Sequence, residues 1–126
     1  MAVCQEFGIE LENPAIPKIA SGFAGGIGNT GATCGAVVGA VMAIGLKLGR
    51  ADTMEGMLQN LSVPRKLRRR FETEMGDIGC RELTGQDLST EDGIAKLMNS
   101  DISQKVCFPA VSAAYRIAVE LLRETK

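Results

Sequence analysis

The chain has 126 residues, enough for one domain with a substantial core and too few for two domains of ordinary size. Its formal net charge of -1 and its 45% hydrophobic residues are typical of a soluble globular protein, and they favour neither nucleic acid nor an anionic membrane surface as a partner. Because the chain contains no histidine, Ser-His-Asp and Cys-His catalytic pairs, histidine-ligated zinc and histidine-ligated haem are excluded.

The sequence begins without a secretory signal, since no basic segment is followed there by an apolar one. The most apolar run, residues 36–46, is too short to cross a bilayer. We therefore expect a cytoplasmic protein without membrane insertion. Four cysteines are spread along the chain without a C-x-x-C pair: Cys4, Cys34, Cys80 and Cys107. In a reducing compartment such cysteines are more often catalytic, metal-binding or simply buried than joined in disulfides.

The first part of the chain is expected to form two short helical segments and a loop. Residues 1–11 form the end of a helix that Gly8 stops, and residues 15–21 form a second segment with Ile19 among its inward residues. Residues 22–31 form a glycine-rich loop, whose backbone can take positive φ values or approach a partner atom closely.

The central helix is expected to follow this loop and to end at Gly49. Across residues 32–48 the only charged side chain is Lys47, and apolar residues fall on every face, which is typical of a helix at the centre of a domain. We expect the helix to begin near residues 30–32, which places Cys34 in its first turn. There the free N–H groups and the positive end of the helix dipole favour a thiolate, a good nucleophile and metal ligand. The alternative, of equal weight, is a small buried residue among glycines.

Two further helices are expected between residues 52 and 76. The first begins with a capping box of Asp52 and Glu55. Its apolar face comprises Met54, Met57, Leu58 and Leu61. Proline suits a first helical turn, so Pro64 is expected to end this helix and to start the next one, which Gly76 stops. The inward residues of the second helix lie four apart: Val63, Leu67, Phe71 and Met75.

The same region carries a basic cluster: Arg65, Lys66, Arg68, Arg69 and Arg70. Most runs of this kind are solvated helix faces, and acidic residues nearby partly balance this one. The alternative is a docking surface for an acidic partner or an anionic ligand.

In the last third of the chain, residues 77–85 are expected to form a loop that presents Cys80 between two glycines. Ser89 or Thr90 caps a short helix that runs to Met98. A final helix begins at Phe108 or Pro109, directly after Cys107, and runs to Glu124. Its inward residues are Val111, Ala114, Ala118, Leu121 and Leu122. No strand signal is present, so the sequence predicts a single all-α domain, 1–126, a small bundle of about five to six helices around the central glycine- and alanine-rich helix.

Gly26, Gly28 and Gly31 match the dinucleotide-binding fingerprint G-x-G-x-x-G. This match is weak, because the fingerprint works only between a strand and a helix and the preceding segment is a poor strand. A glycine nest at a helix N-terminus is nevertheless able to hold a phosphate, a sulfur anion or a cluster sulfide. These three glycines are therefore candidate cofactor-binding residues.

The hexapeptide CGAVVG at residues 34–39 resembles the CGAxxG hallmark of the family of small redox-active proteins named for its C-GCAxxG-C-C cysteine pattern. The resemblance covers nearly the whole chain: IASGFAGGIG before the hexapeptide, CRELTG at residues 80–85 as the third cysteine block, and Cys107 ahead of the last helix. The start differs, because the family's first cysteine lies further upstream with a fuller apolar helix after it. Part of that helix is then missing, and Cys4 either replaces the first cysteine or is an ordinary core residue.

The resemblance implies a redox protein in which Cys34, Cys80 and Cys107 form one site. They would act either by thiol–disulfide exchange or in electron transfer, as thiolate ligands of an iron–sulfur cluster or another soft metal. A cluster would need Cys4, a carboxylate or a second subunit as its fourth ligand. Family members often lie near transporter genes, which implies a redox partner protein or a transporter component as a partner.

A second hypothesis is a non-catalytic interaction module that docks through its basic helix and whose cysteines are structural. A homodimer agrees with both hypotheses, because the small residues of the central helix allow close contact between subunits. Whether the protein is an enzyme is left open by the sequence.

Overall fold

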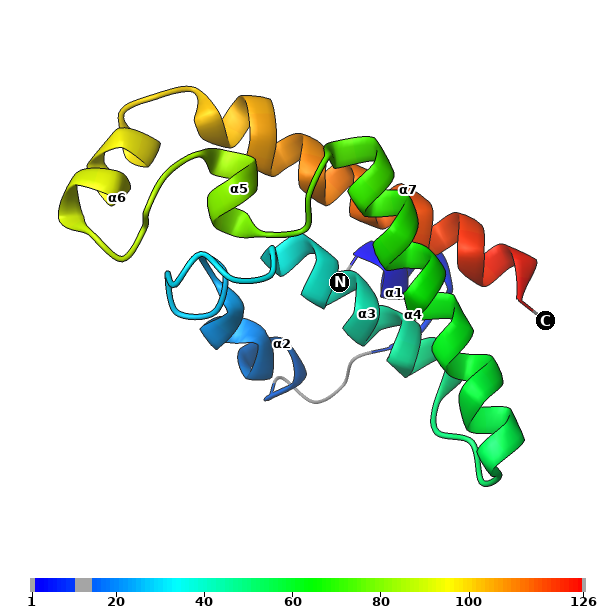
Figure 1. Ribbon diagram of the computed structural model, residues 1–126. Coiled ribbons are helices and arrows are strands. Elements are labelled where there is room, and N and C mark those ends of the chain that lie inside the picture. Colours follow the sequence, from blue (N-terminus) through cyan, green and yellow to red (C-terminus); the bar gives the residue numbers. More distant parts are fainter. Residues whose placement is uncertain (1, 11–14, 126) are drawn as a thin grey trace.

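The computed structural model of the protein describes residues 2–10 and 15–125, and these residues form an all-α fold (Figure 1). The described elements are α1 (Ala2–Glu6), α2 (Ala15–Ile19), the 3₁₀ turn η1 (Ala20–Phe23), α3 (Gly35–Leu48), α4 (Met54–Met75), α5 (Cys80–Thr84), α6 (Glu91–Met98), the π-helical turn η2 (Ser103–Cys107) and α7 (Phe108–Glu124). The predicted fold class, a small helical bundle, is confirmed. The prediction of a loop across residues 77–85 is wrong, because α5 lies within it.

Three long helices, α3, α4 and α7, pack against one another and form the core (Figure 1). Leu67, Phe71 and Ile117 have no exposed surface, and α7 alone buries eight of its side chains. The helix α3 contacts α1, η1, α4 and α7, as expected for a central helix. It is nevertheless buried on one side only, since Val41 is 38% and Leu46 is 42% exposed. Its small residues and the short elements beside it leave part of its surface open.

Several helices begin or end at the residues that the sequence predicts, where the capping residue lies next to the helix in the sequence. Gly49 and Gly76 follow α3 and α4 with φ values of 70° and 94°, which glycine adopts without a Cβ clash. Thr90 caps α6 by accepting a hydrogen bond from the Gly93 N–H at 3.0 Å. The last helix begins and ends where predicted. Within the described residues, no helix combines the length and the apolar character that a membrane span requires.

The start of α3 differs from the prediction. The helix begins at Gly35, with Cys34 as its N-cap, and not at residues 30–32. Thr33 instead pairs with Gly79 in an isolated antiparallel bridge, and the Ala32 carbonyl accepts the Cys80 N–H. These bonds to a distant segment hold the backbone extended just before Cys34, so the helix cannot start earlier.

The prediction that Pro64 divides the α4 region into two helices is wrong, because α4 is one helix of 22 residues with Pro64 inside it. Proline removes one backbone donor, but Val63, Leu67 and Phe71 are buried on the same face and hold the second half in line with the first. The predicted Asp52 cap is also wrong: the N-cap is Thr53, whose hydroxyl accepts the Gly56 N–H at 3.0 Å.

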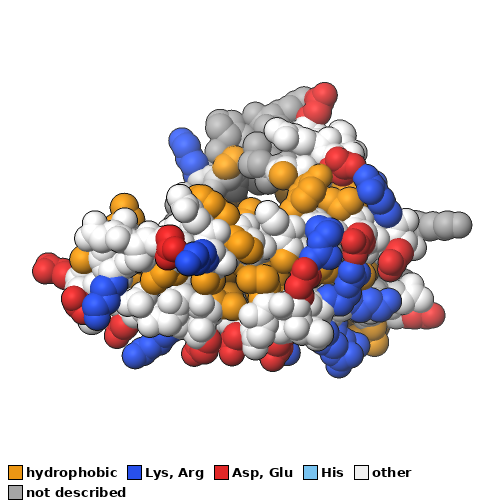
Figure 2. Space-filling model, turned by 90° about the horizontal axis from the view of Figure 1, so that it is seen from above, with side chains coloured by type: hydrophobic (Ala, Val, Ile, Leu, Met, Phe, Trp, Pro, Cys, Tyr) orange, Lys and Arg blue, Asp and Glu red, His pale blue; other side chains and the backbone are white. Residues whose placement is uncertain are grey.

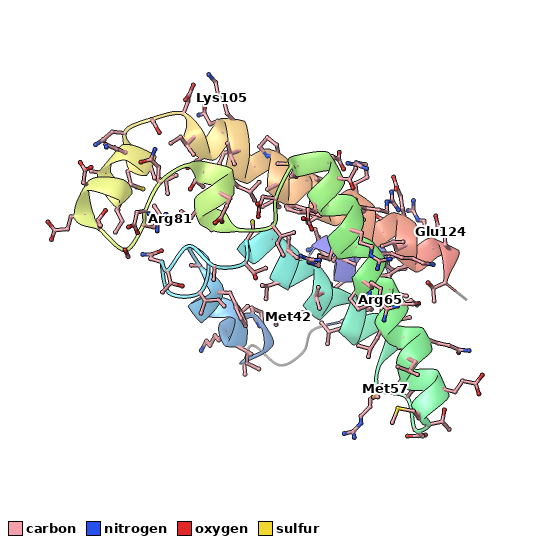
Figure 3. The ribbon with its side chains drawn as sticks, viewed as in Figure 1. Met42, Met57, Arg65, Arg81, Lys105 and Glu124 are labelled. Atoms are coloured by element: carbon pink, nitrogen blue, oxygen red, sulfur yellow. The ribbon has the colours of Figure 1, made fainter. Side chains whose placement is uncertain are left out.

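Some residues predicted to face the core are exposed. On α4 they are Met54, Met57, Leu58 and Leu61, with exposed fractions from 41% to 68%. Met57 lies at the end of α4 that extends away from the rest of the bundle, where α3 and α7 leave these side chains largely uncovered (Figure 3). Ile19 and Val111 are also exposed, by 68% and 57%. Figure 2 shows hydrophobic side chains reaching the surface over the middle of one face of the molecule.

Candidate functional site

Two backbone segments far apart in the sequence run side by side and position two of the cysteines. The Cys34 N–H donates to the Ile78 carbonyl and the Cys80 N–H donates to the Ala32 carbonyl, both at 2.7 Å. These bonds flank the antiparallel bridge between Thr33 and Gly79. Side chains alternate between the two faces of such a ribbon, so Cys34 and Cys80 lie on the same face as diagonal neighbours. Each stands where its segment turns into a helix, α3 or α5.

The glycine-rich loop lies against this ribbon. Gly26 is buried with a φ of 73°, and a Cβ at this position would lie 2.8 Å from the Cβ of Cys80. A Cβ at Gly31 would likewise lie 2.8 Å from the Cβ of Arg81, a residue of α5 on the side of the loop (Figure 3). Gly28 is exposed, and a Cβ there would meet nothing within 4 Å. The loop therefore packs tightly against the start of α5 through Gly26 and Gly31.

The structure around Gly26, Gly28 and Gly31 differs from the one that the dinucleotide-binding fingerprint requires. The 3₁₀ turn η1 precedes the loop, where the fingerprint requires a strand. Gly26 lines a pocket, whereas Gly31 packs on Arg81 and Gly28 faces outward. A cofactor-binding role for the three glycines stays a prediction, and packing against α5 accounts for two of them without a cofactor.

One pocket of about 210 Å³ is lined by Cys34, Cys80 and Cys107 together. Cys34 comes from the N-cap of α3, Cys80 from the first residue of α5 and Cys107 from the last residue of η2. Each of the three is partly exposed. The fourth cysteine, Cys4, does not line this pocket; it is 2% exposed and lies on α1, which packs against α3 and α7.

Cys107 directly precedes α7, as predicted, but this helix has no free N-terminus. The Cys107 backbone is helical, since η2 continues directly into α7 and the Phe108 N–H bonds back to the Ser103 carbonyl. Cys34 is different, because it is the true N-cap of a helix of 14 residues and has an extended backbone. The positive end of a helix dipole favours an anion at that position.

The three thiols influence one another electrostatically. Burial raises the pKa of Cys80 above its ordinary value, and the negative charges of Cys34, Cys107 and Glu82 raise it further. Burial also raises the pKa of Cys107, followed by the charge of Cys34. Cys34 is thus the neighbour common to both other thiols. A largely apolar pocket disfavours a second thiolate beside a first one, so a charge on Cys34 disfavours the ionisation of Cys80 and Cys107.

A metal centre is a poorer match to this arrangement. Among the residues that the structure describes, no three cysteine or carboxylate side chains are gathered closely enough to hold a metal ion. Cys4, the predicted fourth ligand, lies on a different element and outside the pocket. An iron–sulfur cluster needs four thiolate-type ligands at one point, and the described side chains do not provide that set.

Several residues of the site escaped the sequence analysis. Thr84 is buried, and its hydroxyl donates to the Cys80 carbonyl at 2.8 Å and accepts the Gln86 N–H at 3.2 Å. Leu97 on α6 and Val106 on η2 line the pocket from segments with no special motif. For Thr84 a signal exists, because Thr-Gly after Cys80 matches the end of a short helix. For Leu97 and Val106 the sequence contains none, since only packing brings them to the cysteines.

Together, the all-α fold and the shared pocket define a small protein with three neighbouring thiols. The chain belongs to the family "Putative redox-active protein (C_GCAxxG_C_C)", whose model matches residues 1–121. This confirms the family predicted from the cysteine blocks, and the family's name assigns redox activity in general terms. Neither a curated protein nor a solved structure matches the chain.

Proposed function

We propose that this protein carries out thiol–disulfide exchange, with Cys34 as the attacking thiol and Cys80 or Cys107 as the second thiol. The observation that supports this most directly is that Cys34, Cys80 and Cys107 line one pocket and that the charge of Cys34 raises the pKa of both others. Cys34 is also the N-cap of α3, a helix of 14 residues.

The exchange has two steps. The Cys34 thiolate attacks one sulfur of a substrate disulfide, forms a mixed disulfide and releases the other half of the substrate as a thiolate, which takes up a proton. A thiolate of Cys80 or Cys107 then attacks the Cys34 sulfur, and the second half of the substrate leaves in the same way. Two protein thiols are oxidised to one disulfide, and the substrate disulfide is reduced to two thiols. An external thiol reductant returns the protein to its starting state.

The electrostatics of the pocket support this order of steps. Besides burial, a negative charge on Cys34 raises the pKa of Cys80 and Cys107 and so disfavours their ionisation. In the mixed disulfide Cys34 has no charge, so this contribution disappears. The second thiol therefore ionises more readily after the first step than before it, which is when the second step needs a thiolate.

The proposal is tested by counting free thiols before and after treatment with a small disulfide and again after dithiothreitol. The wild-type protein should lose two thiols reversibly, and Cys34→Ser should lose none. Of Cys80→Ser and Cys107→Ser, one should retain the two-thiol reaction and the other should stop at the mixed disulfide. Cys4→Ala is the matched control and should behave as the wild type, since Cys4 lies outside the pocket. Reversible loss of two thiols in Cys34→Ser would overturn the proposal.

A further inference from the structure

We infer that the substrate of this thiol site is an uncharged, apolar disulfide and that charged disulfides such as glutathione disulfide are poor substrates. This inference rests on the proposed thiol–disulfide exchange and adds the chemical class of the molecule that enters the pocket.

The first argument is the composition of the pocket. Among the described residues that line it none is charged, and apart from the thiols their side chains are almost all aliphatic: Ala36, Leu83, Leu88, Leu97, Val106, Ala110 and Val111. The one polar side chain among the lining residues other than the cysteines, Thr84, already uses its hydroxyl for the Cys80 carbonyl and the Gln86 N–H. A charged group that enters this pocket would lose its water and gain no partner of opposite sign.

The second argument is the charge around the thiols. Glu82 lies close enough to Cys80 for its charge to raise the pKa of that thiol. The nearby cation Arg81 is 3.8 Å from the Asp87 carboxylate, so its charge is directed toward an anion of the protein itself. The attacking group is itself an anion. An anionic disulfide would therefore meet negative charge, and no charged side chain among the described lining residues offsets it.

The third argument is the length of the apolar space. A second pocket of about 320 Å³ continues between α3 and α7 and shares Gly35, Ala36 and Val111 with the thiol pocket. Its other lining residues include Gly39, Ala43 and Tyr115. The two pockets together have the size and the apolar character of a small-molecule site, roughly 300–1,000 Å³. The disulfide end of an elongated apolar molecule fits the thiol pocket, and its alkyl or aryl end fits the space beyond Val111.

The test uses two aliphatic disulfides that differ in charge, diethyl disulfide and the larger dianion dithiodipropionate. The variant Val111→Lys, described below, separates the contribution of charge from that of size. The rate constant for reaction of the reduced protein with each is divided by the rate constant for N-acetylcysteine amide, which removes the intrinsic reactivity of the reagent. For the wild-type protein this normalised rate should be at least about tenfold higher with diethyl disulfide, because only the anion loses its solvation on entry.

Val111→Lys is the informative variant, because Val111 is 57% exposed and lines both pockets, so a lysine there is tolerated by the fold and brings a cation to the entrance. It should reduce the preference for diethyl disulfide to about threefold or less, mainly by speeding the reaction with dithiodipropionate. Val41→Lys is the matched control: Val41 is an exposed valine on α3 that lines neither pocket, and its replacement should leave the preference unchanged.

The outcomes separate this inference from the function on which it rests. Reversible oxidation of two thiols with equal normalised rates for both reagents would overturn the substrate class and leave thiol–disulfide exchange standing. Equal changes of the preference in Val111→Lys and Val41→Lys would likewise overturn the substrate class and leave thiol–disulfide exchange standing. If neither reagent oxidises the thiols reversibly, the proposed function fails and the inference fails with it.

Discussion

At the scale of single residues, the absence of a side chain at Gly26 decides how closely the glycine-rich loop approaches Cys80. The residue has a φ of 73°, and an added Cβ would lie 2.8 Å from the Cβ of Cys80 and 2.5 Å from the Ala32 nitrogen. Gly28 has a similar φ of 62° but open space around it. Substitutions at these two glycines therefore distinguish two losses of stability: the loss from an unfavourable backbone conformation and the loss from overpacking.

We predict that Gly26→Ala lowers the free energy of unfolding by about 2–4 kcal/mol, since it adds overpacking to an unfavourable backbone conformation. Gly28→Ala should cost only about 1–2 kcal/mol, because it has the backbone contribution alone. Urea denaturation measures both values. Gly26→Ala should also change the rate at which a maleimide labels Cys80, and Gly28→Ala should not. Equal losses of stability and unchanged labelling in both variants would contradict the packing of the loop on Cys80.

The raised pKa values of two thiols predict how the free energy of unfolding depends on pH. The folded protein raises the pKa of Cys80 and Cys107, so in alkaline solution the folded state binds more protons than the unfolded state. The contribution of these thiols to the free energy of unfolding should be fully present below the ordinary thiol pKa of about 8.5 and should fall as the pH rises above it. In Cys34→Ser the fall should be shallower, because the charge of Cys34 is lost and only burial and the other neighbours remain. Denaturation at several alkaline pH values measures this slope. A slope as steep in Cys34→Ser as in the wild type would show that Cys34 does not act on the other thiols.

At the scale of the elements, α4 consists of two halves with different surroundings. The part from Val63 onward buries Val63, Leu67 and Phe71 against the core, while the part before it leaves Met54 and Leu58 exposed. The basic cluster lies in the later part, on the faces that point away from the core. Arg68 pairs with Glu72 on the same helix, and Arg70 pairs with Glu120 on α7. These two arginines agree with a solvated helix face, and the docking surface predicted as the alternative stays a prediction that concerns the exposed Arg65, Lys66 and Arg69.

We predict that two leucines of α4 respond very differently to substitution. Leu67→Ala should lower the free energy of unfolding by about 2–5 kcal/mol, because Leu67 is fully buried. Leu58→Gln should change it by less than about 0.5 kcal/mol, because Leu58 is 54% exposed. Thermal or urea unfolding of both variants is the measurement. A loss above about 1 kcal/mol in Leu58→Gln would mean that another copy of the chain or a partner covers this part of α4 in solution.

At the scale of the whole molecule, the thiol pocket exists only where three separate segments meet. The ribbon between residues 31–34 and 78–81 joins the starts of α3 and α5, and η2 brings Cys107 to them from the beginning of α7. On the other side of the bundle, ion pairs join α4 to α7 through Arg116 and Glu74, and α7 to α1 through Arg123 and Glu6. The predicted homodimer, the cytoplasmic location and the redox partner or transporter component all stay predictions.

Much of the helical framework could be predicted from the sequence, because helix periodicity and helix caps depend on residues within about one turn of each other. Gly49, Gly76 and Thr90 end or begin helices as expected, and Val63, Leu67 and Phe71 face the core. The family also followed from the sequence, because the cysteine blocks at residues 34–39 and 80–85 lie within short local patterns.

Only the tertiary structure decided the features that depend on distant partners. The bridge between Thr33 and Gly79 sets where α3 begins, and burial of Leu67 and Phe71 in the core keeps α4 continuous through Pro64. The tertiary structure also decided that Cys34, Cys80 and Cys107 line one pocket and that Cys4 does not. Contacts between residues close in the sequence specify most of the helices. The site arises from hydrogen bonds and packing between segments that are tens of residues apart in the sequence. No local sequence pattern shows that such segments lie close together in space.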